Sequence, residues 1–372
     1  MSGLLSGMRA STQSPAVTGV YRSFNDPRLF EPTPLRDALD EALTTYVSPD
    51  SRPRRDAPAP SDFARRVHGY EILNQYVVGG QWRALALAAE ASITETQGDD
   101  ARTLRYWVYR ILALTQMGAS VAADRELGRL ELVGSLRRWP FELRVLRAQV
   151  PGLARGAWLM CVDRLSALLR GCQRKAAAAD EGAYGQRVFR LTLLLLRCVV
   201  ELRDSSLAAQ LLDQLPEDAL VLSAAARMYL QLGGIPSAER LFVRVEGLVP
   251  KDDLLTLMNR ALYAVAAGKW DTARDMFAKL VAAHPDLLAA GNNLALCDLY
   301  LGHPQAMLNG LQALMAEAPA MAGTSEELVF NYCTGLDLHY DGVKLRDAKA
   351  KKLVEVATWA GDGFDTASFK LT

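Results

Sequence analysis

An excess of charge of either sign and long apolar runs are both missing from this 372-residue sequence. Lysine plus arginine and aspartate plus glutamate each number 42, so the formal net charge is zero. Nucleic acids and anionic membranes select proteins with a surplus of positive charge, so neither is indicated as a partner. The longest run of leucines, at 193–196, is far too short to cross a bilayer. We therefore expect a soluble protein that contacts membranes only through its partners.

Cysteine and histidine are sparse. The five cysteines include no Cys-x-x-Cys pair, and their odd number and apolar neighbours predict buried free thiols in a reducing, cytoplasmic compartment. None of the four histidines has a cysteine or a second histidine at the spacing of metal ligands. A metal site is therefore not expected.

Catalytic signatures are missing as well. The sequence contains no phosphate-binding Gly-x-x-x-x-Gly-Lys-Ser/Thr loop, no His-Glu-x-x-His and no Gly-x-Ser-x-Gly. No Gly-x-Gly-x-x-Gly follows a predicted strand. We therefore expect no enzyme activity and no cofactor.

The first 62 residues differ from the rest in composition. Serine, threonine, proline and arginine dominate there, and such a stretch buries too little apolar surface to offset its ordering entropy. We predict a mostly disordered leader over 1–62. One island, 34–46, has apolar residues at helical spacing and predicts a short amphipathic helix that docks on the body or on a partner.

From residue 63 to the end, apolar residues recur at three- and four-residue steps, and an internal repeat emerges. A glycine is followed by alanine five residues later, by a bulky apolar residue after four more, and by a proline eight residues beyond that. The glycine makes the turn, the alanine lets two helices approach closely, the bulky residue fills the core and the proline ends the second helix. Two copies fit this pattern throughout: Gly233, Ala238, Phe242 and Pro250, and then Gly268, Ala273, Phe277 and Pro285.

This pattern is that of the tetratricopeptide repeat, a helix–turn–helix of about 34 residues. The two strong repeats cover 219–252 and 254–287, and looser copies bring the number to about seven. In one of these, Arg203 stands where glycine is usual; in another, Pro151 predicts a kink or an early break. The predicted fold is all-α: a solenoid of helix pairs over 63–372, with capping helices within 325–357.

The last predicted helix, 344–357, is amphipathic. Its basic residues should face water while the apolar face covers the final core, because a solenoid needs a terminal helix with one polar face. These residues are Lys344, Arg346, Lys349, Lys351 and Lys352. The segment beyond it contains Phe364, Phe369 and Leu371, which is too apolar for a free tail. We expect this tail to fold back onto the cap or to enter a groove of a partner.

Two asparagines, Asn259 and Asn293, lie on predicted first helices, next to the concave face. In some tetratricopeptide proteins, asparagine and lysine residues at such places bind the terminal carboxylate of a peptide. The companion lysines are missing here, so a hydrogen bond from each asparagine to neighbouring backbone is the favoured interpretation.

The C-terminal third resembles a specific family. The stretch 292–302 (NNLALCDLYLG) is similar to the last repeat of subunit 12 of the transport protein particle complex, TRAPP. The ending, 351–357 (KKLVEVA), 361–366 (GDGFDT) and 370–371 (KL), resembles the closing motif of that family. The stretch 227–233 (RMYLQLG), together with 238–240, shows the resemblance as well. Weaker similarity reaches upstream to about residue 65 and includes Trp107.

This resemblance implies a non-catalytic subunit of a TRAPP III-type tethering complex. Such complexes act on a Rab-family GTPase in traffic from the ER to the Golgi apparatus and in autophagy. The implied partners are the other large TRAPP subunits, and any membrane association would be peripheral. A peptide or cargo receptor of the co-chaperone or import-receptor type remains the alternative, as does a helical-repeat enzyme such as a prenyltransferase α-subunit.

Overall fold

The protein is described here from a computed structural model. The structure describes residues 21–34, 37–54, 69–177, 181–212 and 217–371. Every regular element in these ranges is helical, and from α3 onward the helices form eight antiparallel pairs. Their bounds are α3 Tyr70–Val78, α4 Trp82–Glu95, α5 Asp100–Gln116, α6 Ser120–Val133, α7 Phe141–Arg155, α8 Trp158–Ala176, α9 Glu181–Leu202, α10 Ser205–Leu212, α11 Ala219–Gln231, α12 Ile235–Leu248, α13 Leu254–Ala266, α14 Trp270–Ala283, α15 Leu288–Tyr300, α16 Pro304–Glu317, α17 Glu326–His339 and α18 Gly342–Trp359.

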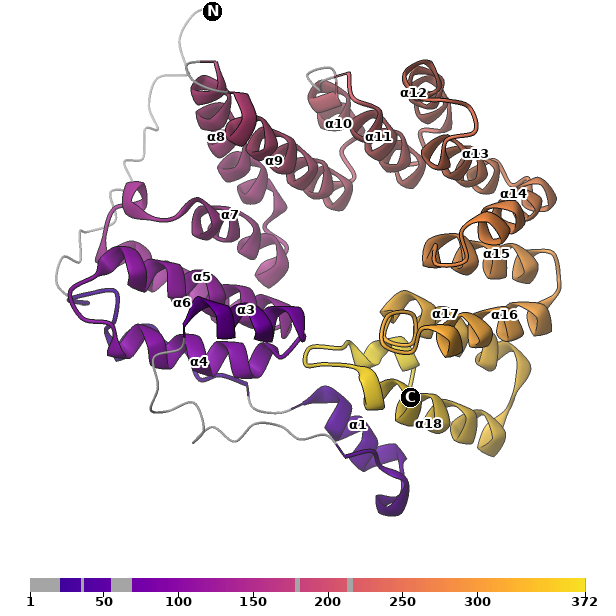
Figure 1. Ribbon diagram of the computed structural model, residues 1–372, viewed down its shortest axis with the longest axis horizontal. Helices are drawn as coiled ribbons and strands as arrows, with labels where there is room; N and C mark the ends of the chain where they lie inside the picture. Colours follow the sequence, from indigo (N-terminus) through magenta and orange to yellow (C-terminus); the bar gives the residue numbers. More distant parts are fainter. Residues whose placement is uncertain (1–20, 35–36, 55–68, 178–180, 213–216, 372) are drawn as a thin grey trace, which may run out of the picture.

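The pairs follow one another around an arc (Figure 1). Several neighbouring first helices contact each other, namely α5 with α7, α9 with α11 and α11 with α13, and the first helices lie on the inner side of the arc. The expected all-α solenoid is therefore confirmed. The solenoid has one helix pair more than the seven predicted repeats. The two predicted capping helices form this additional pair, α17 and α18, which closes the last core.

The turn between the helices of a pair needs a left-handed residue. Gly233 has φ +78° and Gly268 has φ +71°, and in both cases the next helix begins two residues later. Ala238, Phe242, Ala273 and Phe277 are fully buried between the helices, while Pro250 and Pro285 lie exposed just beyond the second helices. Arg203, which stands at the same turn position, also has a positive φ of 54°.

Two of the looser repeats have the same turn as the strong repeats. The glycine of the first turn with positive φ is Gly80, not Gly79. The turn at Gly302 has the usual length, because Met307 rather than Ala306 takes the buried position five residues on. Methionine is unbranched and flexible, so it can occupy the buried position at which the strong repeats have alanine.

The expected break at Pro151 does not occur. Proline lacks an N–H, so the carbonyl of Arg147 loses its helical partner. The guanidinium of Arg164 on α8 donates to that carbonyl at 2.9 Å, which satisfies it. The helix α7 therefore continues to Arg155 and ends at Gly156 in the left-handed conformation, with φ +68°.

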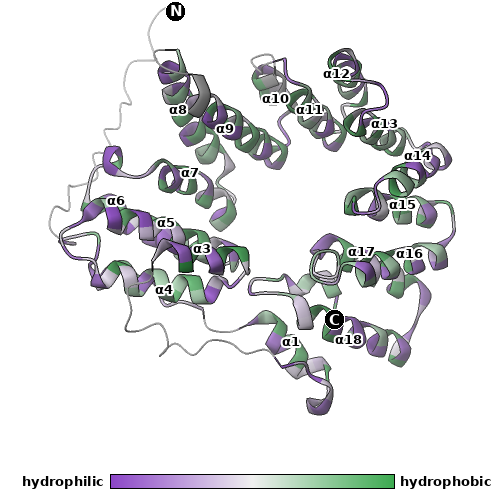
Figure 2. Ribbon diagram, viewed as in Figure 1, coloured by the Kyte–Doolittle hydropathy of each residue, from purple (hydrophilic) through white to green (hydrophobic). Residues whose placement is uncertain are grey.

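The core is divided along the chain, with separate clusters of buried side chains under successive pairs. Apolar residues, green in Figure 2, recur along both helices of a pair, and hydrophilic residues occupy the remaining faces. This division is typical of solenoids, whose units bury their surfaces only against their neighbours. The two end clusters are exceptions, because each also contains residues from the leader.

Candidate functional site

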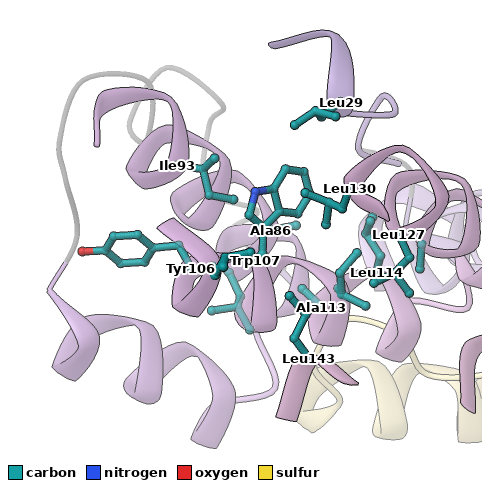
Figure 3. Close-up of a cluster of buried hydrophobic side chains, with 14 of the residues drawn as sticks. Leu29, Ala86, Ile93, Tyr106, Trp107, Ala113, Leu114, Leu127, Leu130 and Leu143 are labelled. Atoms are coloured by element: carbon teal, nitrogen blue, oxygen red, sulfur yellow. The ribbon is translucent and has the colours of Figure 1, made fainter. Parts of the chain in front are cut away.

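The leader segment 21–34, which we call the strap, lies against the first helix pairs. Trp107 on α5 is fully buried, and its indole Nε1–H donates to the carbonyl of Phe24 at 2.8 Å. The ring of Phe30 stacks on Trp107 with a centroid distance of 4.9 Å. Leu29, on the short 3₁₀ helix η1 Pro27–Leu29, is fully buried and belongs to the cluster shown in Figure 3. The strap therefore packs into the core of the first helix pairs, in the way that a bound peptide packs against its receptor.

A buried arginine connects the strap to α5. Arg110 is fully buried and pairs with Glu126 at 2.8 Å and with Glu90 at 2.7 Å. It also donates to the carbonyl of Glu31 at 2.8 Å and to Thr33 Oγ1 at 2.6 Å. Burial raises the pKa of Glu126, and the positive charge of Arg110 opposes that rise. Because a buried charge is costly without partners, Arg110 and Glu126 depend on each other.

Glu126 also accepts from the strap, through the backbone N–H of Glu31 at 2.8 Å. Arg129 donates to the carbonyls of Leu29 and Phe30 at 3.2 and 3.1 Å. These bonds satisfy backbone groups that have no partner in regular secondary structure. The prediction of a mostly disordered leader over 1–62 is thus wrong for the strap, whose aromatic and backbone groups find partners in the first repeats.

The helix α1, Ala38–Tyr46, continues the leader at the opposite end of the arc. Its Leu39, Ala42 and Leu43 are buried against α18 and the C-terminal segment. This helix begins later than the predicted 34–46, and Leu35 and Arg36 lie outside the described residues. The leader therefore contacts the first helix pairs through the strap and the last pair through α1, as Figure 1 shows.

The residues between α18 and the C-terminus complete the contact between the two ends. Asp362 donates its N–H to the carbonyl of Gly80 at 3.1 Å and accepts from the N–H of Arg83 at 2.9 Å. The guanidinium of Arg83, which is 7% exposed, lies 2.8 Å from Asp362 and 2.8 Å from Asp37 of the leader. Three segments far apart in sequence therefore meet at one arginine. We call this contact the closure.

The flanking glycines explain the Gly-Asp-Gly sequence. A Cβ on Gly361 would lie 2.7 Å from the carbonyl oxygen of Gly80, and one on Gly363 would lie 2.5 Å from that of Gln116. Gly363 also has φ +85°, which disfavours any other residue. The motif that carries the family resemblance thus lies at the place where the last repeat approaches the first two.

The tail folds back on the body of its own chain. Phe369 is fully buried, Phe364 is 8% exposed and Leu371 is partly buried, all in the same cluster as Leu39 and Leu43. A 3₁₀ turn, η4 Thr366–Phe369, lies against α17 and α1. Of the two alternatives for this tail, the structure shows the intramolecular one, so these side chains are not a free surface for a partner.

The lysines of α18 also differ from expectation. Lys349 and Lys352 are buried rather than solvated, with exposed fractions of 6% and 3%. Lys349 pairs with Asp337 at 2.6 Å and donates to the carbonyl of Lys370 at 2.8 Å. The ammonium group of Lys352 donates to Oε1 of Gln312 at 2.7 Å. The same nitrogen lies 4.6 Å from the ring centroid of Tyr332. Long stems let these residues line the core while their ammonium groups reach polar partners.

The two asparagines lie on first helices, Asn259 on α13 and Asn293 on α15, and do not come together as a site. Asn259 is 1% exposed, and its Oδ1 accepts from Ser223 at 2.8 Å and from Arg227 at 3.1 Å, both on α11. Its partners are thus side chains of the preceding repeat and not backbone. Asn293 is half-buried.

The charged residues of the closure and the strap were not anticipated from the sequence. In the sequence, Arg110 stands among the apolar residues of its helix, next to Ile111. Arg83 likewise stands between Trp82 and Ala84. A charged residue at a core position of an amphipathic helix was the available signal.

In the part of the chain that the structure describes, no three histidine, cysteine or acidic side chains gather to hold a metal ion. Within the same residues, no helix is long and apolar enough to cross a membrane.

Comparison with known proteins places the chain. No protein-family model matches it. The mouse trafficking protein particle complex subunit 12 is 25% identical over 90% of this chain and 48% of its own length. The human subunit 12 is 25% identical over 72% of this chain and 42% of its own length. The chain therefore spans less than half the length of either relative.

Among solved structures, a tetratricopeptide repeat protein from Parabacteroides merdae is 11% identical and covers 77% of this chain and 96% of its own, with a TM-score of 0.37. The fold assignment comes from the helix pairs themselves. The sequence relatives confirm the resemblance that the closing motif indicated: over most of its length, this chain is similar to subunit 12 of the trafficking protein particle complex.

Proposed function

We propose that this chain is a non-catalytic scaffold subunit of a TRAPP III-type vesicle-tethering complex. The observation that carries the proposal is the similarity to subunit 12 over 90% of the chain. The closure supports it, because the Gly-Asp-Gly motif joins the two ends of a solenoid. A solenoid held at both ends presents fixed surfaces to its neighbours, as a scaffold must.

The finer proposal concerns the setting. In it the complex acts on a Rab-family GTPase in ER-to-Golgi traffic and in autophagy, and other subunits carry out nucleotide exchange. The chain would be cytoplasmic and would reach ER and Golgi membranes peripherally, through the other large subunits. Its role would be to hold those subunits in a fixed arrangement.

A peptide receptor that binds a terminal carboxylate is less well supported. The carboxamide oxygen of Asn259 is engaged by Ser223 and Arg227 of the same chain, at 2.8 and 3.1 Å. Asn293 lies one repeat away without lysines beside it in the sequence. A carboxylate would have to displace these internal bonds, at a cost typical of buried polar groups.

Affinity purification of the tagged chain from its own cells, with quantitative mass spectrometry, tests the proposal. We expect other subunits of the trafficking particle in near-equal molar amounts, co-eluting in gel filtration. Asp362→Lys places a positive charge against the guanidinium of Arg83 at the closure, so this variant should reduce that recovery. Asp347→Lys, on the exposed side of α18, should not. Recovery of chaperones or cargo alone, without particle subunits, would contradict a scaffold role.

A further inference from the structure

A groove runs across three first helices, α5, α7 and α9, on the inner layer of the arc. It consists of two adjoining hollows of about 550 and 520 Å³ that share Val108, Phe141, Glu142 and Arg187. The floor of the larger hollow is aliphatic and partly exposed, and comprises Val108, Leu112, Val145, Leu146 and Leu194. The smaller hollow adds the aromatic rings of Tyr70 and Tyr109. The floor offers apolar surface that no described segment of this chain covers.

The rim of this groove is basic. Arg105, Arg187 and Arg190 line it, against a single acidic residue, Glu142. The guanidinium of Arg187 lies 4.5 Å from the ring centroid of Phe141. Among the described residues, none of the three arginines forms an ion pair with a carboxylate, although ion pairs are frequent elsewhere in the chain. In a protein of zero net charge, three unpaired arginines beside apolar surface form a local positive patch.

We propose that this groove binds an acidic amphipathic helix of a partner protein. The apolar face of such a helix would cover the aliphatic floor, and its aspartates or glutamates would pair with Arg187 and Arg190 on one side and Arg105 on the other. The arginine fork suits bidentate pairing with carboxylates, and its stem adds to the apolar wall. This inference deepens the proposed function, on which it rests, by specifying the chemistry of one partner.

The two longest segments outside the described residues do not match the rim in charge. Residues 1–20 contain one arginine and no acidic residue, and residues 55–68 contain three arginines and two aspartates. Both segments would bring positive charge to a positive rim. The floor also argues for protein over nucleic acid: bases stack on aromatic rings, whereas five aliphatic side chains make up most of this surface. We therefore take the occupant to be a helix of a partner protein with an acidic polar face.

Designed peptides test this directly. Three fluorescent amphipathic helices of about 18 residues, roughly 27 Å long, share one apolar pattern and differ only in polar faces rich in glutamate, lysine or glutamine. Their binding to the full chain is measured by anisotropy, with a single-stranded oligonucleotide of equal negative charge as a fourth probe. Arg187→Glu with Arg190→Glu reverses the rim. Arg170→Glu with Arg174→Glu makes the same charge change on α8, outside the groove.

We expect the glutamate peptide to bind best, and the groove variant to weaken it by at least about tenfold and to favour the lysine peptide instead. The α8 variant should behave as wild type, and a benzophenone on the apolar face of the peptide should cross-link near Val145. Equal binding of all three peptides, tighter binding of the oligonucleotide, or no effect of the groove variant would overturn the proposal. If the groove variant still purifies with all particle subunits, the groove is not their contact, yet the scaffold role stands. Absence of those subunits from the wild-type purification would contradict the scaffold role alone.

Discussion

Arg83 and Asp362 are separated by 279 residues, yet the N–H of Arg83 donates to Oδ2 of Asp362 at 2.9 Å while its guanidinium lies 2.8 Å from Oδ1. The same guanidinium reaches Asp37 of the leader at 2.8 Å. One side chain in the first repeat thus connects the leader, the first helix pair and the closing motif. The closure makes the last repeat a neighbour of the first, which an open solenoid does not do.

Removing Arg110 should destabilise the chain strongly. Arg110→Ala leaves Glu126 buried and unpaired and frees the strap, and we expect a loss of about 3–5 kcal/mol in the free energy of unfolding by urea denaturation. Arg102→Ala, an exposed position on the same helix, should stay within about 0.5 kcal/mol of wild type. The double variant Arg110→Met with Glu126→Leu should recover part of the loss. An Arg110→Ala protein as stable as the Arg102→Ala control would show that the buried pair does not hold the strap.

Arg203→Gly should stabilise the chain. Arg203 occupies a turn position with φ +54°, where a side chain costs roughly 1–2 kcal/mol and glycine costs little beyond its extra freedom in the unfolded state. We expect a net gain of about 0.5–1 kcal/mol, measured by thermal and urea unfolding. Arg203→Ala keeps the steric cost and serves as the control. A gain for alanine equal to that for glycine would mean that the backbone at this turn is not left-handed.

Ala273→Leu should overpack the contact between α13 and α14. Ala273 is fully buried, beside Phe277 and the residues of α13, so three added heavy atoms force neighbouring side chains to move. We expect a loss of about 1–3 kcal/mol. Thr272→Leu adds bulk at the adjacent exposed position and should change little. Identical melting of the two variants would contradict the repeat register.

Acid should loosen the attachment of the tail at Asp337. Burial raises the pKa of this carboxyl, but hydrogen bonds and charge from Lys349 and Lys370 outweigh burial and hold the pKa below its usual value. A carboxyl whose pKa is lower in the folded state stabilises the fold at pH values above its unfolded-state pKa, which is near 4. That contribution is lost as the pH falls through the folded-state pKa. The difference in unfolding free energy between wild type and Asp337→Asn should therefore be largest at pH 7 and shrink below about pH 4. A difference that is constant from pH 7 to pH 3 would rule this linkage out.

The sequence predicted the helix pairs because their causes are local. Gly233 and Ala238 are five residues apart, and the turn and the close approach depend on side chains within one repeat. The strap and the closure depend on polar pairs far apart in sequence, such as Arg110 with the backbone of Glu31 and Arg83 with Asp362. No periodicity marks such pairs. The closing motif lies outside the repeat pattern, but the reason for its glycines, the close approach of Gly361 to Gly80, appears only in three dimensions.

The proximity of the two ends tests the account most directly. Val78 at the end of α3 and Trp359 at the end of α18 are 89% and 57% exposed. In the sequence, Val78 is close to Gly80 on one side of the closure, and Trp359 is close to Asp362 on the other. Because all five native cysteines are buried, cysteines introduced at these two positions can be labelled selectively for single-molecule energy transfer. The account predicts one population of high transfer in the otherwise wild-type chain, and lower, broader transfer when Asp362→Lys is added but not when Asp347→Lys is added. Low transfer in the otherwise wild-type chain, or high transfer that survives Asp362→Lys unchanged, would contradict a solenoid closed by Arg83 and Asp362.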